Sequence, residues 1–156
     1  MGRCSARAGT TPQTNRPLNV YGRNVNLFHC PADKGDAFTL PGPPSCWEAY
    51  GNSYLIEWQY DRFGVEKVTG DNGAKSGTAV EGNRGNRIAK KPSTKIIQGD
   101  WPWHPNRPVD DTRSAWHNYA SKRRDNMLYG DGHLEYSKLP DTMDVTQPVD
   151  LNYTWW

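Results

Sequence analysis

The stretch RRDNMLYGDGHLEYSK, residues 123–138, carries the strongest local pattern in the chain. Asp131-Gly132 is a pair typical of a two-residue type I′ turn, in which both residues take a positive φ. Such a turn places Tyr129 opposite Leu134 and Met127 opposite Tyr136. These four apolar side chains then share one side of the hairpin. The turn chemistry and the alternation of side chains therefore agree on an antiparallel hairpin with one buried face.

A second strand is expected in SYLIEWQY, residues 53–60, where side chains alternate between two faces. The face predicted to be buried carries Tyr54, Ile56, Trp58 and Tyr60. The other carries Ser53, Leu55, Glu57 and Gln59. On this pattern Glu57 is a solvent-facing residue, as are Glu48 and Glu135, so no catalytic pair of carboxylates is expected.

Shorter strands are predicted at Asn24 to His29, which the Cys30-Pro31 pair ends, and at the Ile96-Ile97 run, which ends at Gly99-Asp100. Residues 64–91 are rich in Gly, Asn, Lys and Thr and are expected to form a long surface excursion. The proline-punctuated WPWHPNRP segment, residues 101–108, is expected to be irregular.

Composition limits the fold to one small domain. The chain has 156 residues, of which 35% are hydrophobic, with 15 Gly and 12 Pro. These numbers indicate one modest core and many loops. We therefore expect an α+β or mainly β fold, a small antiparallel sheet with long irregular loops. Residues 1–16 are expected to be disordered, and residues 17–156 to form a single globular domain.

Charge and hydropathy exclude two classes of partner. The formal net charge is only +2 and the basic residues are scattered, whereas a nucleic-acid-binding face needs a dense basic surface. No apolar run approaches the roughly 20 residues that span a bilayer. The sequence shows no signal-peptide core after Met1.

The cysteines allow two interpretations. Cys30 and Cys46 bracket a loop rich in Pro and Gly, and a disulfide between them would stabilise the fold by roughly 3 kcal/mol. The alternative is two buried free thiols in a reducing compartment. We take the disulfide as the prediction.

Several histidines and aspartates lie near predicted strand ends, where they could form a divalent metal site from nitrogen and oxygen ligands. The candidate ligands are Asp100, His104, His117, Asp131 and His133. Their spacing matches no specific metal motif, and loop capping is the alternative role. No resident cofactor is otherwise indicated. No nucleophile motif is present either, so an enzyme is not expected.

Tryptophans provide candidate contact surfaces. The WPWH and YTWW segments contain four of them: Trp101, Trp103, Trp155 and Trp156. Exposed indole rings would suit sugar stacking or a protein partner, whereas buried rings would close the edges of a small core. An extracellular module that binds carbohydrate or a divalent metal is therefore the alternative function.

Three motifs in order resemble a known family. LFHCPAD, GNSYLIE, and WHN followed by NMLYGDGHLEY look like pseudopilin-like proteins that have a prepilin-type N-terminus and a C-terminal motif of His, nine residues and Asp-Gly. By this resemblance the motif residues are His117, Asp131 and Gly132. Thirteen residues separate His117 from Asp131 here, which departs from the family spacing.

The resemblance implies a non-enzymatic structural subunit, the globular head of a pilin-like protein in a type II secretion or surface-filament apparatus. Its location would be periplasmic or at the cell surface. The N-terminal anchoring helix of the family is not found in this sequence, so membrane attachment would depend on that missing helix. A sheet face without that helix needs another cover, and we expect self-association or contact with other pilin-like subunits.

Overall fold

The computed structural model describes residues 21–22, 24–37, 45–57, 61–69, 85–108, 110–117, 124–137, 139–140 and 143–156. The segment predicted to be disordered, residues 1–16, lies outside them. So do Trp58, Gln59 and Tyr60.

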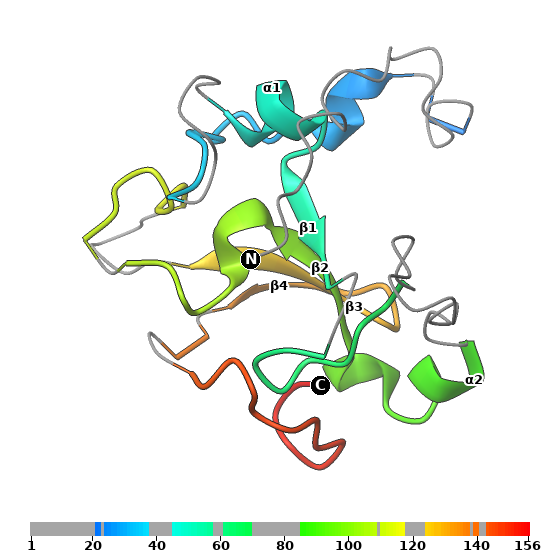
Figure 1. Cartoon of the computed structure of the whole chain (residues 1–156). Helices are drawn as coiled ribbons and strands as arrows, with labels where there is room; N and C mark the ends of the chain where they lie inside the picture. The colour runs from blue at the N-terminus through cyan, green and yellow to red at the C-terminus, as the bar shows by residue number, and fades with distance from the viewer. Residues whose placement is uncertain are drawn as a thin grey trace, which may run out of the picture.

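The fold is a four-stranded antiparallel sheet with short helices around it, as the sequence predicts (Figure 1). The strands pair in chain order, β1-β2-β3-β4. They are β1 (Tyr54–Ile56), β2 (Ile96–Asp100), β3 (Asp125–Tyr129) and β4 (Leu134–Ser137). The helices are η4 (Val25–Phe28), α1 (Cys46–Tyr50), α2 (Gly85–Ile88), η5 (Pro92–Thr94) and η6 (Trp101–Trp103).

The predicted hairpin forms, but its turn is one residue longer than expected. The Gly132 N–H donates to the Tyr129 carbonyl at 2.9 Å, and the Tyr129 N–H donates to the His133 carbonyl at 3.0 Å. Gly130, Asp131 and Gly132 therefore form a three-residue loop, with Gly132 in the left-handed region at φ 89°. Leu128, not Tyr129, lies opposite Leu134.

This one-residue shift reverses the face of β4, because successive side chains of a strand point to opposite sides. Met127 and Tyr129 are buried as predicted. Leu134 is 73% exposed and Tyr136 is 37% exposed, so the prediction that they share the buried face is wrong.

The predicted faces of β1 are also reversed. Leu55 is buried, and so are Ser53 and Glu57 at its flanks, whereas Tyr54 and Ile56 are half-buried. Leu55 pairs with Gly99, which pairs in turn with Met127 on β3. The core covers this row of the sheet, which is why the Leu55 side is the buried one.

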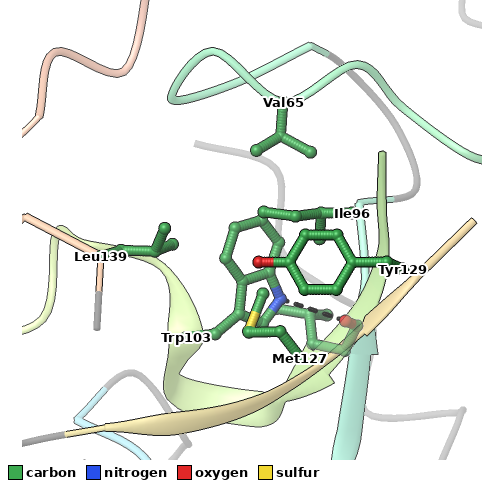
Figure 2. Close-up of a cluster of buried hydrophobic side chains, with 7 residues drawn as sticks. Val65, Ile96, Trp103, Met127, Tyr129 and Leu139 are labelled. Atoms are coloured by element: carbon green, nitrogen blue, oxygen red, sulfur yellow. Dashed lines mark hydrogen bonds between the residues drawn. The ribbon is translucent and has the colours of Figure 1, made fainter. Parts of the chain in front are cut away.

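The main core packs around Trp103, whose indole N–H donates to the Leu55 carbonyl at 3.1 Å (Figure 2). Gly99 lets this indole and the Met127 side chain approach the sheet, since an added Cβ would lie 2.5 Å from the Met127 sulfur. The buried members of the cluster are Leu55, Val65, Ile96, Trp103, Met127, Tyr129 and Leu139.

The backbone of Trp156 pairs with the residues at the start of β2. Its N–H donates to the Thr94 carbonyl and its carbonyl accepts from the Ile96 N–H, both at 2.9 Å. The fully buried Lys95 ammonium donates to the carbonyls of Trp156, Ile96 and Glu66. Burial lowers the pKa of Lys95 to about 8.

Two local predictions need correction. The segment predicted as a strand from Asn24 to His29 contains the 3-10 helix η4, because the Asn24 side chain accepts from the Asn26 N–H and caps a helical turn. The WPW segment, predicted to be irregular, forms the single turn η6. Among the described residues, no helix has the length and apolar character needed to cross a membrane.

Candidate functional site

Three chemically active side chains from distant parts of the chain meet at one point. Cys30 follows η4, Asp100 is the last residue of β2, and His117 precedes β3. The His117 Nε2 lies 3.4 Å from the Cys30 Sγ and 3.4 Å from the Asp100 Oδ2. Cys30 and Asp100 are buried, and the His117 side chain is partly exposed.

Asp33 fixes the loop that carries Cys30. Its Oδ1 accepts from the N–H groups of Gly35 and Cys46, and its Oδ2 accepts from the Trp47 N–H and the Ser53 hydroxyl. These bonds are 2.7–2.9 Å long. One carboxylate therefore holds the start of α1 and the residue before β1 against the Cys30 loop.

Asp100 is held by the neighbouring strand. Its Oδ2 accepts from the Asn126 N–H at 2.7 Å and from the Asn126 side-chain amide at 3.1 Å. Its Oδ1 is buried and has no hydrogen-bond partner among the described residues. Burial raises the pKa of the Asp100 carboxyl, and the Asn126 hydrogen bonds and the nearby His117 oppose that shift.

The predicted disulfide is wrong, because Cys30 and Cys46 are both free thiols. The two residues are buried in one cluster with Trp116, but the Cys30 sulfur contacts His117 instead. Burial raises the pKa of both thiols, which keeps them protonated near neutral pH in the absence of a bound cation.

The five predicted metal ligands divide into three groups. Asp100 and His117 come together, as described above. His104 does not join them: its Nε2 lies 2.9 Å from a carboxylate oxygen of Glu57, which is 2% exposed, so the prediction that Glu57 faces solvent is wrong. Asp131 and His133 pair with each other on the exposed hairpin turn.

Sequence reasoning missed Cys30 as a member of the ligand cluster because it was assigned to the disulfide. Within the described residues, one group of three potential metal ligands has all its ligand atoms within 4.8 Å of one another. It consists of Cys30, Asp100 and His117. The available signal was the residue type, since a thiolate is a strong ligand for zinc.

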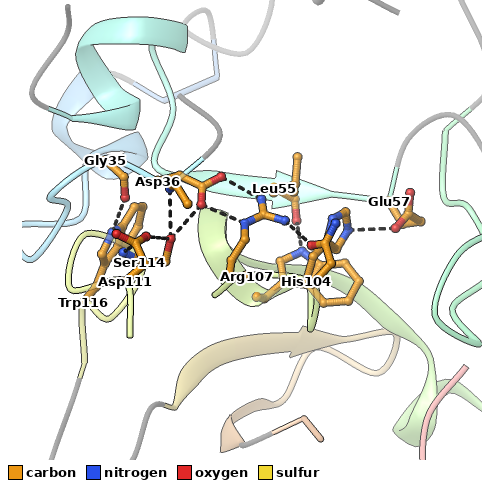
Figure 3. A network of polar contacts seen from close by, with 12 residues as sticks. Gly35, Asp36, Leu55, Glu57, His104, Arg107, Asp111, Ser114 and Trp116 are labelled. Atoms are coloured by element: carbon orange, nitrogen blue, oxygen red, sulfur yellow. Dashed lines mark hydrogen bonds and ion pairs between the residues drawn. The ribbon is translucent and has the colours of Figure 1, made fainter. Parts of the chain in front are cut away.

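A second buried polar network was also missed (Figure 3). Arg107 donates two hydrogen bonds of 2.7 Å to the Asp36 carboxylate, and the Ser114 hydroxyl oxygen lies between this carboxylate, at 2.9 Å, and that of Asp111. Nearby, the Trp116 indole N–H donates to the Gly35 carbonyl. This network joins the loop after Cys30 to Arg107 and to the segment that contains Ser114 and Trp116.

The tryptophan candidates are mainly packed. Trp103 and Trp156 are buried, which excludes their rings as an open sugar-stacking surface. Trp101 is half-buried and stacks on Tyr50 with 4.3 Å between ring centroids. Trp155 is half-buried against the main core.

The motif histidine contacts the hairpin away from its turn. The Tyr136 hydroxyl donates to the His117 carbonyl, and the two rings meet edge to face. Asp131 is engaged with His133 instead. Asp131 and Gly132 therefore shape the hairpin, and His117 belongs to the Cys30 cluster.

Comparison with known proteins identifies no relative: no family model, no curated protein and no solved structure matches the chain.

Proposed function

We propose that this protein is a non-enzymatic structural subunit, the globular head of a pilin-like or pseudopilin-like protein. It would act in a type II secretion or surface-filament apparatus, in the periplasm or at the cell surface. The observation that carries the proposal is that the three sequence motifs of the resemblance contact one another in the fold.

Two contacts join different motifs, and a third links the two parts of the last motif. Cys30 of LFHCPAD contacts His117 of WHN, and Asp33 of LFHCPAD accepts from Ser53 of GNSYLIE at 2.7 Å. His117 in turn accepts from Tyr136 of the hairpin motif. The motif residues thus hold the loops against the sheet. Such fixed contacts suit a scaffold that presents surfaces to other subunits.

The surface proposed for subunit contact is the β4 edge. Within the described residues β4 pairs with β3 alone, so part of its outer edge can pair with another strand, although the Tyr136 carbonyl already accepts from the Arg124 side chain. Leu134 and Tyr136 add exposed apolar area to this edge. The proposed partner is a second copy of the chain or another pilin-like subunit.

Site-specific photo-crosslinking in the cells that make the protein tests this assignment. A photoreactive phenylalanine analogue at Leu134 should yield adducts with a pilin-like subunit, recovered in the envelope or sheared-filament fraction. Leu27 is the matched control position, because it is 63% exposed but lies on η4, away from the hairpin.

Mass spectrometry of the adducts separates the outcomes. Adducts from position 134 and not from position 27 support the proposal. A protein that is recovered as an uncrosslinked cytoplasmic monomer, or that crosslinks equally from both positions, would contradict it.

A further inference from the structure

We propose that Cys30, Asp100 and His117 bind one divalent transition metal ion of the zinc class, with a fourth coordination position left for water. This inference rests on side-chain geometry and is independent of the proposed assembly role.

The distances between the three groups fit a common metal ion. Bonds of about 2.3 Å to sulfur and about 2.0–2.1 Å to nitrogen and oxygen, at tetrahedral angles, separate sulfur from nitrogen by about 3.6 Å and nitrogen from oxygen by about 3.3 Å. The corresponding separations are 3.4 Å from Cys30 Sγ to His117 Nε2 and 3.4 Å from His117 Nε2 to Asp100 Oδ2. The third separation, from Cys30 Sγ to an Asp100 carboxylate oxygen, is no more than 4.8 Å, so an ion can enter once the thiol and the carboxylate adjust toward it.

The state of Asp100 is a second, independent observation. Its side chain is fully buried, yet in the part of the chain that the structure describes its Oδ1 has no hydrogen-bond partner. Leaving a buried carboxylate oxygen unpaired costs free energy that a cation in contact with both oxygens of the Asp100 carboxylate would recover. Asp36 provides the comparison within this chain, because its equally buried carboxylate is matched by two bonds from Arg107.

The local charges also favour a cation. Asp33 lies three residues after Cys30, and the hydrogen bonds to its carboxylate come from neutral N–H and hydroxyl groups. The ion pair seen for Asp100 is with His117, which is positive only when protonated. A metal ion would supply positive charge to this group of two carboxylates and one thiol.

The ligand set indicates which ion binds. A thiolate, an imidazole and a carboxylate together suit Zn²⁺ and its spectroscopic substitute Co²⁺, whereas Ca²⁺ and Mg²⁺ prefer oxygen ligands alone. On binding, the Cys30 thiol loses its proton to solvent and forms the bond from sulfur to metal. Because the His117 side chain is 26% exposed, the proposal places the fourth position on the side of the site nearest to solvent.

Asn126 is assigned a positioning role. Its backbone N–H and side-chain amide both hold the Asp100 Oδ2, so it orients the carboxylate without touching the ion. Loss of an outer-shell partner of this kind typically lowers metal affinity roughly 10- to 100-fold. Asn126→Ala keeps the backbone bond, and we expect a decrease at the lower end of that range.

Cobalt binding gives the most direct test. Metal-stripped full-length protein, carrying Cys4→Ser so that this residue cannot contribute, is titrated with Co²⁺ and followed by absorption. We expect one equivalent to bind and to produce a near-ultraviolet charge-transfer band from thiolate to cobalt. Zn²⁺ should displace the cobalt and remove the band, and a large excess of Ca²⁺ or Mg²⁺ should leave it unchanged.

Matched variants assign the ligands. Cys30→Ser should abolish the charge-transfer band, whereas Cys46→Ser should retain it, although both thiols are buried in the same cluster. Asp100→Asn and His117→Gln should each weaken Zn²⁺ binding at least about 100-fold, more than loss of an outer-shell group. His133→Gln should leave the affinity unchanged, and circular dichroism confirms that each variant is folded.

Two results would overturn the inference. One is the absence of a thiolate band when the folded parent protein is saturated with Co²⁺. The other is a band that survives Cys30→Ser or is lost in folded Cys46→Ser. The first measurement needs no ligand variant, so misfolding of Cys30→Ser would not prevent a decision.

Discussion

Replacing Arg107 with methionine should lower the free energy of unfolding by about 3–5 kcal/mol, the usual cost of removing one partner from a buried ion pair. The Arg107 and Asp36 side chains are 5% and 1% exposed, and two hydrogen bonds of 2.7 Å join them. The variant leaves a desolvated carboxylate without its cation. The Ser114 hydroxyl lies within hydrogen-bond distance of both Asp36 and Asp111 and has one proton to donate, so it offsets little of this cost.

A double-mutant cycle separates the pair from the packing of the arginine stem. Asp36→Asn and the double variant complete the cycle, measured by urea unfolding with tryptophan fluorescence at constant m-value. We expect the free energy of unfolding to fall less in the double variant than the sum of its decreases in the two single variants. The difference should be about 1–3 kcal/mol.

Arg87 offers a matched control in the same protein. Its ion pair with Glu66 is more exposed, with side-chain exposures of 33% and 21%, so Arg87→Met should cost about 1 kcal/mol or less. The reasoning fails if Arg107→Met costs no more than this control, or if the cycle is additive.

Three further predictions concern other parts of the fold. The free energy of unfolding of the parent protein, relative to that of Lys95→Met, should rise by about 3 kcal/mol between pH 8 and about 10.5. The reason is that Lys95 binds a proton more strongly in the unfolded state than in the folded state in this pH range. Urea unfolding at a series of pH values measures the change. Gly130→Ala should cost about 1–3 kcal/mol in thermal unfolding, since the new Cβ would lie 3.1 Å from the Pro92 carbonyl. Gly85→Ala meets no atom of the described residues within 4 Å and should be neutral. Zn²⁺ at about 100 times its dissociation constant should stabilise the parent protein by about 2.7 kcal/mol in chemical denaturation, and a similar gain in His117→Gln would contradict the assigned ligand.

Local patterns were sufficient to predict the hairpin and β2, because turn residues and short apolar runs act over a few neighbouring positions. They did not determine the register. The sequence Gly130-Asp131-Gly132 permits a two-residue or a three-residue loop, and the choice depends on which glycine adopts positive φ. The predicted loop was one residue too short, and this error alone placed Leu134 on the buried face in the prediction.

The reversed faces of β1 have a different origin. Glu57 is polar and was assigned to solvent, but its partner His104 lies 47 positions away in the sequence. Ser53 is buried because Asp33 accepts its hydroxyl proton. Such pairs depend on tertiary contacts, which alternation within one strand does not encode.

The candidate site was predicted in part. Convergence of strand ends brought Asp100 and His117 into one set, and the structure places them together. Cys30 was omitted because its spacing from Cys46 suggested a disulfide, and the choice between bridge and ligand depends on where the sulfur points. The prediction that Asp131 and His133 join this set of metal ligands was wrong, because the two side chains pair with each other at the hairpin turn.

The burial of Lys95 has a consequence for chemical labelling. Its amine lies among three backbone carbonyls and beneath the Trp156 ring, so an acylating reagent can reach it only when the contact between β2 and residue 156 opens. Lysines such as Lys90, which is exposed, react from the folded protein. The ratio of the two labelling rates, read by peptide mass spectrometry, would therefore report how often this part of the sheet separates under native conditions.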